Sequence, residues 1–164
     1  MQIKIGDFGM SFEVPEEWDH ALRNSFCGTY QFIAPEIYKS DKDGSMYRYS
    51  FKNDVWAIGV IAYTLLTGAN PFTVQAESVQ HLQELIRECK WSLPKDLPDA
   101  RHSIHARNFV TLLLQEDPEL RPSISEVKAH PFLAGDKCFI PESLPESVFK
   151  RPLTHLEKIL ITEK

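Results

Sequence analysis

The chain has 164 residues, of which 43% are hydrophobic, and this is enough for one globular domain with a packed core. Its net charge of −5 argues against nucleic acid or an anionic membrane as the main partner, because both favour a basic surface. Three cysteines without CxxC spacing predict neither a disulfide framework nor a zinc site, and no apolar stretch reaches the ~18–20 residues of a membrane span. We therefore expect a reduced, intracellular, soluble protein.

The first residues predict a short strand followed by a turn and a long loop. Residues 2–6, QIKIG, alternate polar and apolar side chains, and the strand ends in GDFG. Residues 10–36 show no sustained period and are interrupted by Pro15, Gly28 and Pro35. A loop of this length inside a compact domain is usually functional.

Two helices are predicted in the middle of the chain. Regular structure is expected from about Asp54, where DVWAIGVIAYTLLTG is apolar on nearly every side and Gly68 provides a stop. Such a helix needs protein all around it. Residues 75–89 form an amphipathic surface pattern, with one charged face and one apolar face. The apolar face consists of Val79, Leu82, Leu85, Ile86 and Cys89.

Further helices are predicted towards the C-terminus. Ser103 is the expected cap of a helix that carries a run of apolar residues from Phe109 to Leu114. A short helix from about Ser123 to His130 begins with a capping box formed by Ser123 and Glu126. Residues 141–153 predict an extended tail, and residues 154–164 a short terminal helix. The sum is a mainly α fold of four or five helices with hardly any strand.

Four short motifs occur in a fixed order along the chain. They are Asp7-Phe8-Gly9, Ala34-Pro35-Glu36, Asp54-x-Trp56-x-x-Gly59 and Arg121-Pro122. Each alone is a weak signal, but their joint occurrence in this order is not expected by chance. The first two belong to the signature of protein kinases, with a phosphorylation site expected between them. On these residues the chain resembles the C-terminal lobe of a eukaryotic Ser/Thr protein kinase.

The resemblance implies a fold and a domain organisation. Residues 1–135 would form a partial protein kinase domain, from DFG onward, that lacks the N-terminal β lobe, and residues 136–164 would form a C-terminal tail. The segments SFCGTYQFIAPEI, DVWAIGVIAYTLLTGANPF and CFIPESLPES are similar to the polo-like kinases, which act in the cell cycle. The loop 39–53 is longer than is usual for these kinases, and no polo-box sequence follows it within the 164 residues.

The DFG motif carries the chemistry that the resemblance implies. Phosphoryl transfer requires the charge of the triphosphate to be neutralised and its γ-phosphate to be aimed. Asp7 is implied to ligate the magnesium ion that accompanies ATP, since this hard cation takes oxygen ligands. The alternative is a turn aspartate at the end of a strand. Phe8 is implied to be a packing switch and Gly9 a point where the backbone flips, although both would also suit an ordinary turn.

The segment RNSFCGTYQFIAPE resembles the part of a kinase that carries the activating phosphate and the substrate platform. Ser25 matches the phosphoacceptor, and a phosphate there would add about −1.5 to −2 charges that an arginine could pair with. The alternative is an exposed loop serine. Thr29 matches the threonine that hydrogen-bonds the catalytic aspartate and favours Ser/Thr substrates. Tyr30 departs from the proline or small residue that usually follows.

Other matches imply structural roles. Glu36 and Arg121 resemble the buried ion pair that ties the end of the activation segment to a late helix. Asp54 resembles the carboxylate that holds the backbone of the catalytic loop, and its alternative role is a helix N-cap. His102 and His105 have HxxH spacing without an evident third ligand, so a surface or capping role is expected.

Several parts of the kinase signature are absent from residues 1–164. The sequence contains no GxGxxG, no VAIK lysine and no HRD loop. We therefore expect this chain alone to be inactive and to bind neither ATP nor Mg²⁺ tightly, whereas the full-length parent would use both to phosphorylate protein Ser/Thr. Met1 stands where a kinase strand would continue, which predicts a piece of a longer reading frame.

Two other interpretations stay open. The chain would be a catalytically inactive lobe that serves as a protein-binding or regulatory module, or it would be a non-functional truncated gene product. In every interpretation, an upstream kinase segment or a protein partner is expected to be needed for stability, because the apolar helix at 54–66 lacks cover on one flank. The resemblance places the parent in the cytoplasm, with the nucleus and the centrosome as alternatives.

Overall fold

The computed structural model describes residues 4–14, 21–23, 26–94 and 100–134, and these residues are mostly helical. In chain order the elements are η1 (Phe8–Met10), β1 (Ala21–Arg23), η2 (Tyr30–Phe32), α1 (Pro35–Asp43), β2 (Tyr47–Tyr49), α2 (Phe51–Thr67), α3 (Val79–Arg87), α4 (Ala100–Leu113), η3 (Pro118–Leu120), α5 (Ile124–Ala129) and α6 (Pro131–Ala134). The η elements are single 3₁₀ turns. The mainly helical content agrees with the sequence prediction.

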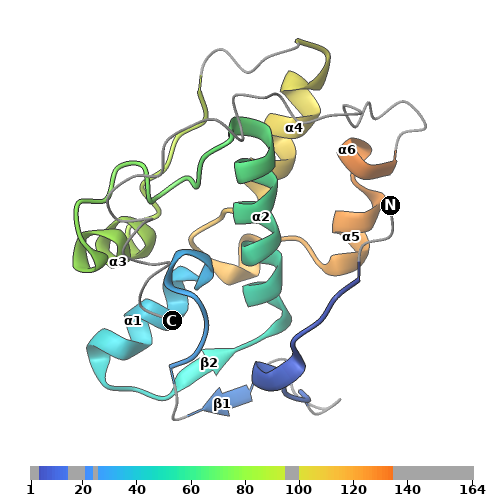
Figure 1. The fold of residues 1–164 in the computed structure, drawn as a ribbon. Coiled ribbons are helices and arrows are strands. Elements are labelled where there is room, and N and C mark those ends of the chain that lie inside the picture. The colour runs from blue at the N-terminus through green and yellow to red at the C-terminus, as the bar shows by residue number, and fades with distance from the viewer. Residues whose placement is uncertain (1–3, 15–20, 24–25, 95–99, 135–164) are drawn as a thin grey trace.

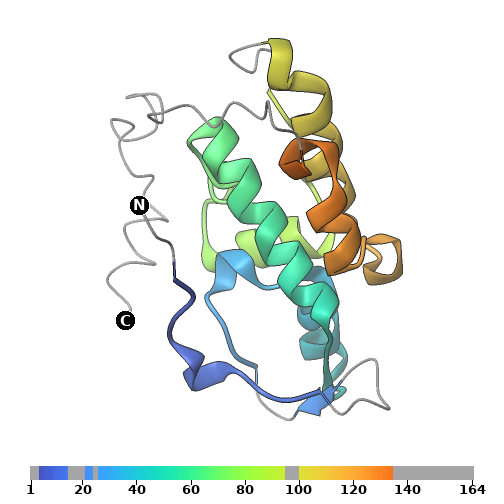
Figure 2. The same ribbon diagram turned by 90° about the vertical axis from the view of Figure 1, so that its right-hand side faces the viewer.

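Helix α2 is the axis of the fold (Figure 1). Helix α4 packs along it, and α6 contacts both α4 and α5. Helix α1 contacts α3 and β2, and the antiparallel pair β1–β2 lies at the end of the molecule where α2 begins. The view turned by 90° shows α4, α5 and α6 gathered on one side of α2 (Figure 2).

Helix α2 is bounded by strong local signals at both ends. The side chain of Ser50 caps the first turn, and Asn53 returns a hydrogen bond to the Ser50 N–H at 2.6 Å. Gly68 ends the helix in the left-handed region with a φ of 76°, as the sequence predicted. The helix thus begins at Phe51, and the alternative role of Asp54 as N-cap is wrong because Ser50 fills that position.

The buried side of α2 is packed closely against α4. A Cβ added at Gly59 would lie 2.8 Å from Leu114 Cδ2 and 2.9 Å from Leu113 Cβ. Any larger residue at this position would therefore push the two helices apart. The other flank of α2 is open: Ile61 is 48% exposed and Leu65 is 52% exposed. The helix is apolar on nearly every side but is enclosed on only part of its circumference.

The predicted amphipathic and capped helices are present, with shifted ends. Helix α3 begins after Ser78, which accepts a hydrogen bond from the His81 N–H, and it buries Leu82, Leu85 and Ile86 as expected. Helix α5 has the predicted capping box between Ser123 and Glu126. Helix α4 begins at Ala100, so Ser103 lies inside it and is not its cap.

The core forms around Trp56, which is fully buried and stacked on Phe72 with ring centroids 5.7 Å apart. Most of the remaining fully buried large side chains come from α1 to α4, and Leu114 directly follows α4. They include Ile37, Tyr38, Val55, Leu82, Ile86, Leu113 and Leu114. Helices far apart in the sequence thus share one core.

The N-terminal strand prediction is wrong for its described part. Residues 4–6 have no regular secondary structure, and the side chain of Ile5 is 87% exposed. A strand requires a neighbouring strand for its hydrogen bonds, and in the described parts of the chain β1 pairs with β2 instead. Helix α1 and the two strands were not predicted, although Pro35 at the first helical position is a known start signal.

Several predictions concern residues outside those described. These are the phosphoacceptor Ser25, the tail at 136–164 and the short helix predicted at its end. Within the described ranges, no helix has the length and apolar character to cross a membrane.

Candidate functional site

The DFG motif stands in an exposed turn. Asp7 has φ 60° and ψ 68°, in the left-handed region, and immediately precedes η1. The turn is closed by the backbone N–H and the hydroxyl of Ser11, which both donate to the Phe8 carbonyl, at 3.0 and 2.7 Å. A non-glycine residue held at positive φ is strained, and such strain is concentrated at functional sites. The turn thus presents the Asp7 carboxylate in a defined orientation.

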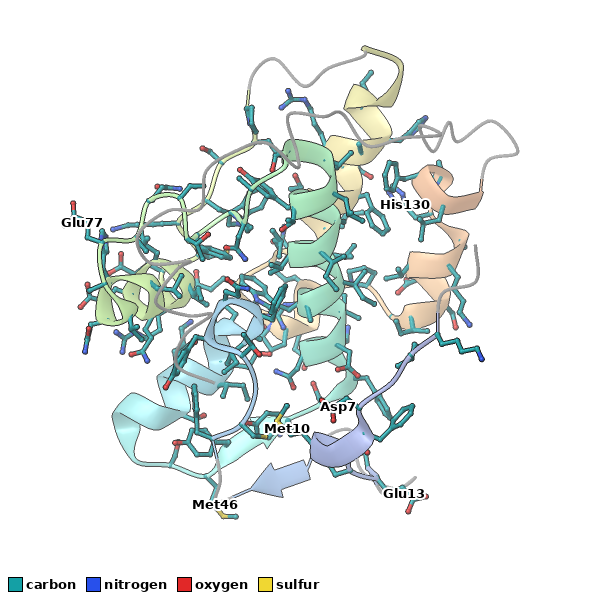
Figure 3. All side chains as sticks on the ribbon, in the orientation of Figure 1. Asp7, Met10, Glu13, Met46, Glu77 and His130 are labelled. Carbon is teal, nitrogen blue, oxygen red and sulfur yellow. The ribbon has the colours of Figure 1, made fainter. Side chains whose placement is uncertain are left out.

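The Asp7 carboxylate is accessible. It makes no hydrogen bond with any of the described residues, so both oxygens can accept a ligand from outside the chain. Figure 3 places Asp7 and Met10 at the same end of the molecule as β1 and β2, while His130 lies far from them beside α5 and α6. The side chain of Phe8 is 66% exposed, so in this structure it has no packing role.

Thr29 and Asp54 line one pocket of about 200 Å³. Met10 and Phe12 line it too, so the pocket connects the segment after the DFG turn with the segment before η2. Thr29 is exposed and directly precedes η2. The structure therefore brings together two residues that the sequence separates by a loop, a helix and a strand.

Gly28 shapes the backbone beside Thr29. Its φ is 120°, which L side chains rarely adopt, and a Cβ there would lie 3.2 Å from Ile33 Cγ1. Conformation and space both favour glycine at this position. Gly9, in contrast, has room for a Cβ, whose nearest contact would be Asp7 Oδ1 at 3.5 Å.

Asp54 lies in the first turn of α2, four residues after the cap. The residue keeps part of its surface in solvent, but the partial loss of hydration raises the pKa of its carboxyl. It has no hydrogen bond to the described residues that would offset this desolvation. The Asp54 carboxylate is thus a hydrogen-bond acceptor that none of the described residues uses.

Glu36 and Arg121 form the ion pair that the resemblance implied. Arg121 Nη1 donates to Glu36 Oε1 at 2.8 Å, and Nη2 donates to Oε2 at 2.7 Å. The side chain of Arg121 is fully buried, and that of Glu36 is 18% exposed. Asn53 Nδ2 adds a bond of 2.6 Å to Glu36 Oε1. This fork-to-fork geometry is the strongest form of a carboxylate–guanidinium contact.

The guanidinium of Arg121 is satisfied on every side. Its Nε donates to the Gln115 carbonyl at 2.8 Å, and Nη1 and Nη2 also donate to the carbonyls of Lys52 and Glu116, at 3.0 and 3.2 Å. The group also lies 5.0 Å from the centroid of the Trp56 ring. All five N–H donors are therefore used. A buried charge without this network would be very costly.

The described residues contain no group of three or more His, Cys, Asp or Glu side chains that could hold a metal ion. His130 has a structural role: its Nε2 lies 2.9 Å from Asn108 Oδ1, and its Nδ1 accepts from the Phe132 N–H at 3.1 Å. Burial and the nearby His105 lower the pKa of His130, which favours the neutral ring. The side chain of His102 lies outside those described.

Sequence reasoning missed Tyr49, whose hydroxyl accepts a hydrogen bond from the N–H of Cys27, two residues before Thr29. The signal was present in YRY at 47–49, because alternation of aromatic and charged residues predicts a strand with one buried face. A strand of three residues gives almost no periodicity, so the sequence predicts a loop over 39–53.

Comparison with known proteins gives a consistent result. The protein kinase domain family matches residues 1–133. The probable serine/threonine-protein kinase CCRP1 of Zea mays is 38% identical over 152 residues, which are 93% of this chain and 22% of that protein. The serine/threonine-protein kinase polo of Drosophila melanogaster is 35% identical over 147 residues, which are 90% of this chain and 23% of that protein. The chain thus spans about a quarter of these relatives.

Solved structures agree with the sequence comparison. The autoinhibited serine kinase domain of the giant muscle protein titin superposes with a TM-score of 0.59 at 25% identity, over 78% of this chain and 36% of that chain. The twitchin kinase region from C. elegans superposes with a TM-score of 0.53 at 27% identity, over 65% of this chain and 18% of that chain. The motifs, the fold and these matches show that the chain belongs to the protein kinase domain family.

Proposed function

We propose that this chain is part of the C-terminal lobe of a Ser/Thr protein kinase. In this proposal, a longer protein that contains the chain transfers the γ-phosphate of ATP to serine or threonine of protein substrates. The carrying observation is the pocket that joins Thr29 to Asp54, while the nearby Glu36 is fixed by the fully buried Arg121. In this arrangement the Glu36–Arg121 pair fixes the backbone near the proposed substrate platform. The side chains of Thr29 and Asp54 stay free to bind groups from outside the described residues.

Each residue has a role in this proposal. Asp7 would hold the magnesium ion, which when bound would neutralise charge on the phosphates of ATP. Thr29 hydrogen-bonds the catalytic aspartate and favours a hydroxyl-bearing substrate. Asp54 accepts hydrogen bonds from the backbone of the catalytic loop, and Glu36 with Arg121 keeps the end of the activation segment in place. Thr29 and Asp54 face the same pocket, as these roles require.

Asp7 supplies only part of what a magnesium site needs. An exposed carboxylate in a fixed turn is a good ligand for a hard cation, and Mg²⁺ is commonly held by one or two protein carboxylates together with phosphates and water. The described residues supply one such carboxylate here and no cluster of three. We therefore propose that residues 1–164 bind Mg²⁺ and ATP weakly by themselves and do not transfer phosphate.

The test compares this chain with the longer protein that contains it. The longer protein should transfer labelled phosphate from ATP to dephosphorylated casein, and the Asp7→Asn variant should lose this activity. Titration calorimetry of residues 1–164 with Mg²⁺–ATP should show no micromolar affinity. Transfer by the Asp7→Asn variant at the wild-type rate would contradict the role of Asp7, and micromolar affinity would contradict the weak binding.

Ser25 has a testable role in the same proposal. Ser25 matches the phosphoacceptor position, so Ser25→Ala in the longer protein should strongly lower kinase activity. Ser25→Asp should keep part of the activity, because a carboxylate carries part of the charge of a phosphate. Equal activity of wild type and Ser25→Ala would remove Ser25 from the mechanism.

A second candidate function is a binding module without catalysis. It is favoured by the exposed apolar side chains near the DFG turn, since Phe8 is 66% and Met10 54% exposed. The two functions differ in one outcome: a module would show no phosphate transfer in the longer protein, and Asp7→Asn would not change its binding to a partner. The polo-like resemblance further suggests the cytoplasm, nucleus or centrosome, which imaging of the tagged longer protein would test.

A further inference from the structure

Strand β2 contacts the segment between the DFG and APE motifs at several points. It belongs to the stretch at 39–53, which is longer than the resemblance led us to expect. Its three residues pair antiparallel with β1, with Ala21 opposite Tyr49, Leu22 opposite Arg48 and Arg23 opposite Tyr47. The ladder ties the middle of that segment to the entrance of α2.

Tyr49 adds a second contact, through a side chain that is only 8% exposed. Its hydroxyl accepts a hydrogen bond from the Cys27 N–H at 3.2 Å and lies 3.6 Å from Cys27 Sγ, which donates to it. Its ring meets Phe12 edge to face, with centroids 5.8 Å apart. One side chain therefore joins the beginning of the segment, at Phe12, to its end, at Cys27.

Tyr47 supplies a third contact on the same face of β2. Its ring lies 5.6 Å from that of Phe26, and Phe26 lies 5.5 Å from Tyr38 of α1. Arg48, between the two tyrosines, is exposed, as the alternation of a strand requires. The side of β2 that faces the segment is therefore aromatic.

The hydroxyl of Tyr49 indicates that this residue positions the backbone and does not merely fill space. An aromatic ring alone would fill the space between Phe12 and Cys27. The hydroxyl also fixes the backbone N–H of Cys27, and the two following residues are Gly28, with φ 120°, and Thr29. A hydrogen bond at this point limits the rotation of the backbone that carries Thr29.

We propose that β2 is a brace for the segment between the two motifs and that Tyr49 is the positioning residue that holds Cys27, Gly28 and Thr29 in place. The brace uses contacts within the chain and needs no phosphate on Ser25. The identification of Thr29 as part of the substrate platform rests on the proposed function, whereas the brace itself does not.

The test uses the Cys27 thiol as a reporter in residues 1–164 that carry Cys138→Ser. Tyr49→Phe keeps the ring and removes the hydroxyl, so maleimide labelling of Cys27 should become faster by about threefold to tenfold, as expected when the hydrogen bonds from the Cys27 N–H and Sγ to that hydroxyl are lost. Cys89, whose thiol donates to the Leu114 carbonyl at 3.3 Å, is the internal reference and should label at an unchanged rate.

Tyr63→Phe is the matched control variant. Tyr63 is 5% exposed, and its hydroxyl donates to the Ser92 carbonyl at 2.9 Å, so it loses an equally buried hydrogen bond elsewhere. It should leave the Cys27 labelling rate unchanged. Hydrogen exchange of the amides at 21–23 should quicken in Tyr49→Ala, where both the ring and the hydroxyl are lost, and not in Tyr63→Phe.

The outcomes separate the brace from the proposed function. Unchanged Cys27 labelling in Tyr49→Phe, or an equal rise in Tyr63→Phe, would overturn the brace. In the longer protein, Tyr49→Phe should lower kcat/KM for a peptide substrate and leave KM for ATP unchanged. Faster labelling together with no phosphate transfer by the wild-type longer protein would uphold the brace and reject the kinase function.

Discussion

The junction around Arg121 and the segment around Asp7 are opposites in the same chain. At the junction, a fully buried guanidinium uses all its donors on Glu36 and on three carbonyls. Around Asp7, Ile5, Phe8 and Met10 are 87%, 66% and 54% exposed, and the carboxylate makes no hydrogen bond with the described residues. Two kinase motifs thus occupy very different environments.

The difference is consistent with the role proposed for each motif. A buried charge must be satisfied within its own fold, because a stranded one is strongly destabilising. A metal ligand or a substrate contact must keep its acceptors open for partners that the chain does not carry. The buried, fully paired contact of Glu36 with Arg121 therefore supports a structural role for both residues. The exposed DFG turn supports the proposal that Asp7 binds a ligand.

The largest effect is expected from breaking the junction. Arg121→Met should lower the free energy of unfolding by about 3 kcal/mol, because the Glu36 carboxylate loses its counter-charge and keeps only the Asn53 amide as a hydrogen-bond donor among the described residues. For a chain of this size that is a fall in Tm of roughly 6–12 °C. Thermal unfolding followed by circular dichroism would measure it.

An exposed ion pair provides the control for that variant. Lys39 Nζ lies 2.6 Å from Glu116 Oε1, but these side chains are 47% and 53% exposed. Lys39→Met should cost about 0–1 kcal/mol, since solvent screens such a pair. Equal losses in the two variants would mean that burial does not distinguish the junction.

The second prediction compares glycines in the closed and open regions. Gly59→Ala should destabilise the chain by about 1–3 kcal/mol, because the new methyl would meet Leu113 and Leu114 at under 3 Å. Gly6→Ala should have almost no effect, since a Cβ there would have nothing within 4 Å. Chemical denaturation of both variants measures the contrast, which would disappear if α2 and α4 were loosely packed.

The sequence predicted the closed region better than the open one. The Gly68 end of α2, the capped start of α5 and the buried face of α3 follow from caps and helical periodicity, which are local signals, whereas the Ser50 cap of α2 was not predicted. The pair of Glu36 with Arg121 followed only from a resemblance, since no local pattern brings two residues 85 positions apart together. The contacts of Tyr49 could not be predicted, because they depend on where two irregular segments meet in space.

The third prediction concerns the open flank of α2. Because Ile61 and Leu65 are about half exposed, residues 1–164 should bind a hydrophobic dye and self-associate at micromolar concentration. The double variant Ile61→Gln, Leu65→Gln should reduce both signals and change stability little, since surface substitutions usually stay within about 0.5 kcal/mol. Dye fluorescence and analytical ultracentrifugation would measure this. A dilute wild-type monomer with a sharp melt and no dye binding would show that the flank is covered.

The smallest expected effect tests whether Asp54 is kept for a partner at the expense of stability. Partial burial raises the pKa of its carboxyl above the ordinary value of 3.8, so at neutral pH the folded chain holds a charge that it would prefer to neutralise. Asp54→Asn removes this charge and should raise Tm slightly at pH 7. As pH falls through the raised folded pKa, the wild-type carboxyl takes up a proton and the difference should shrink. Below the unfolded value both side chains are neutral, and the two melting curves should coincide. A variant that is less stable than wild type at pH 7 would show that the Asp54 carboxylate is already satisfied within the chain, and Asp54 would then belong with the closed junction and not with the open site.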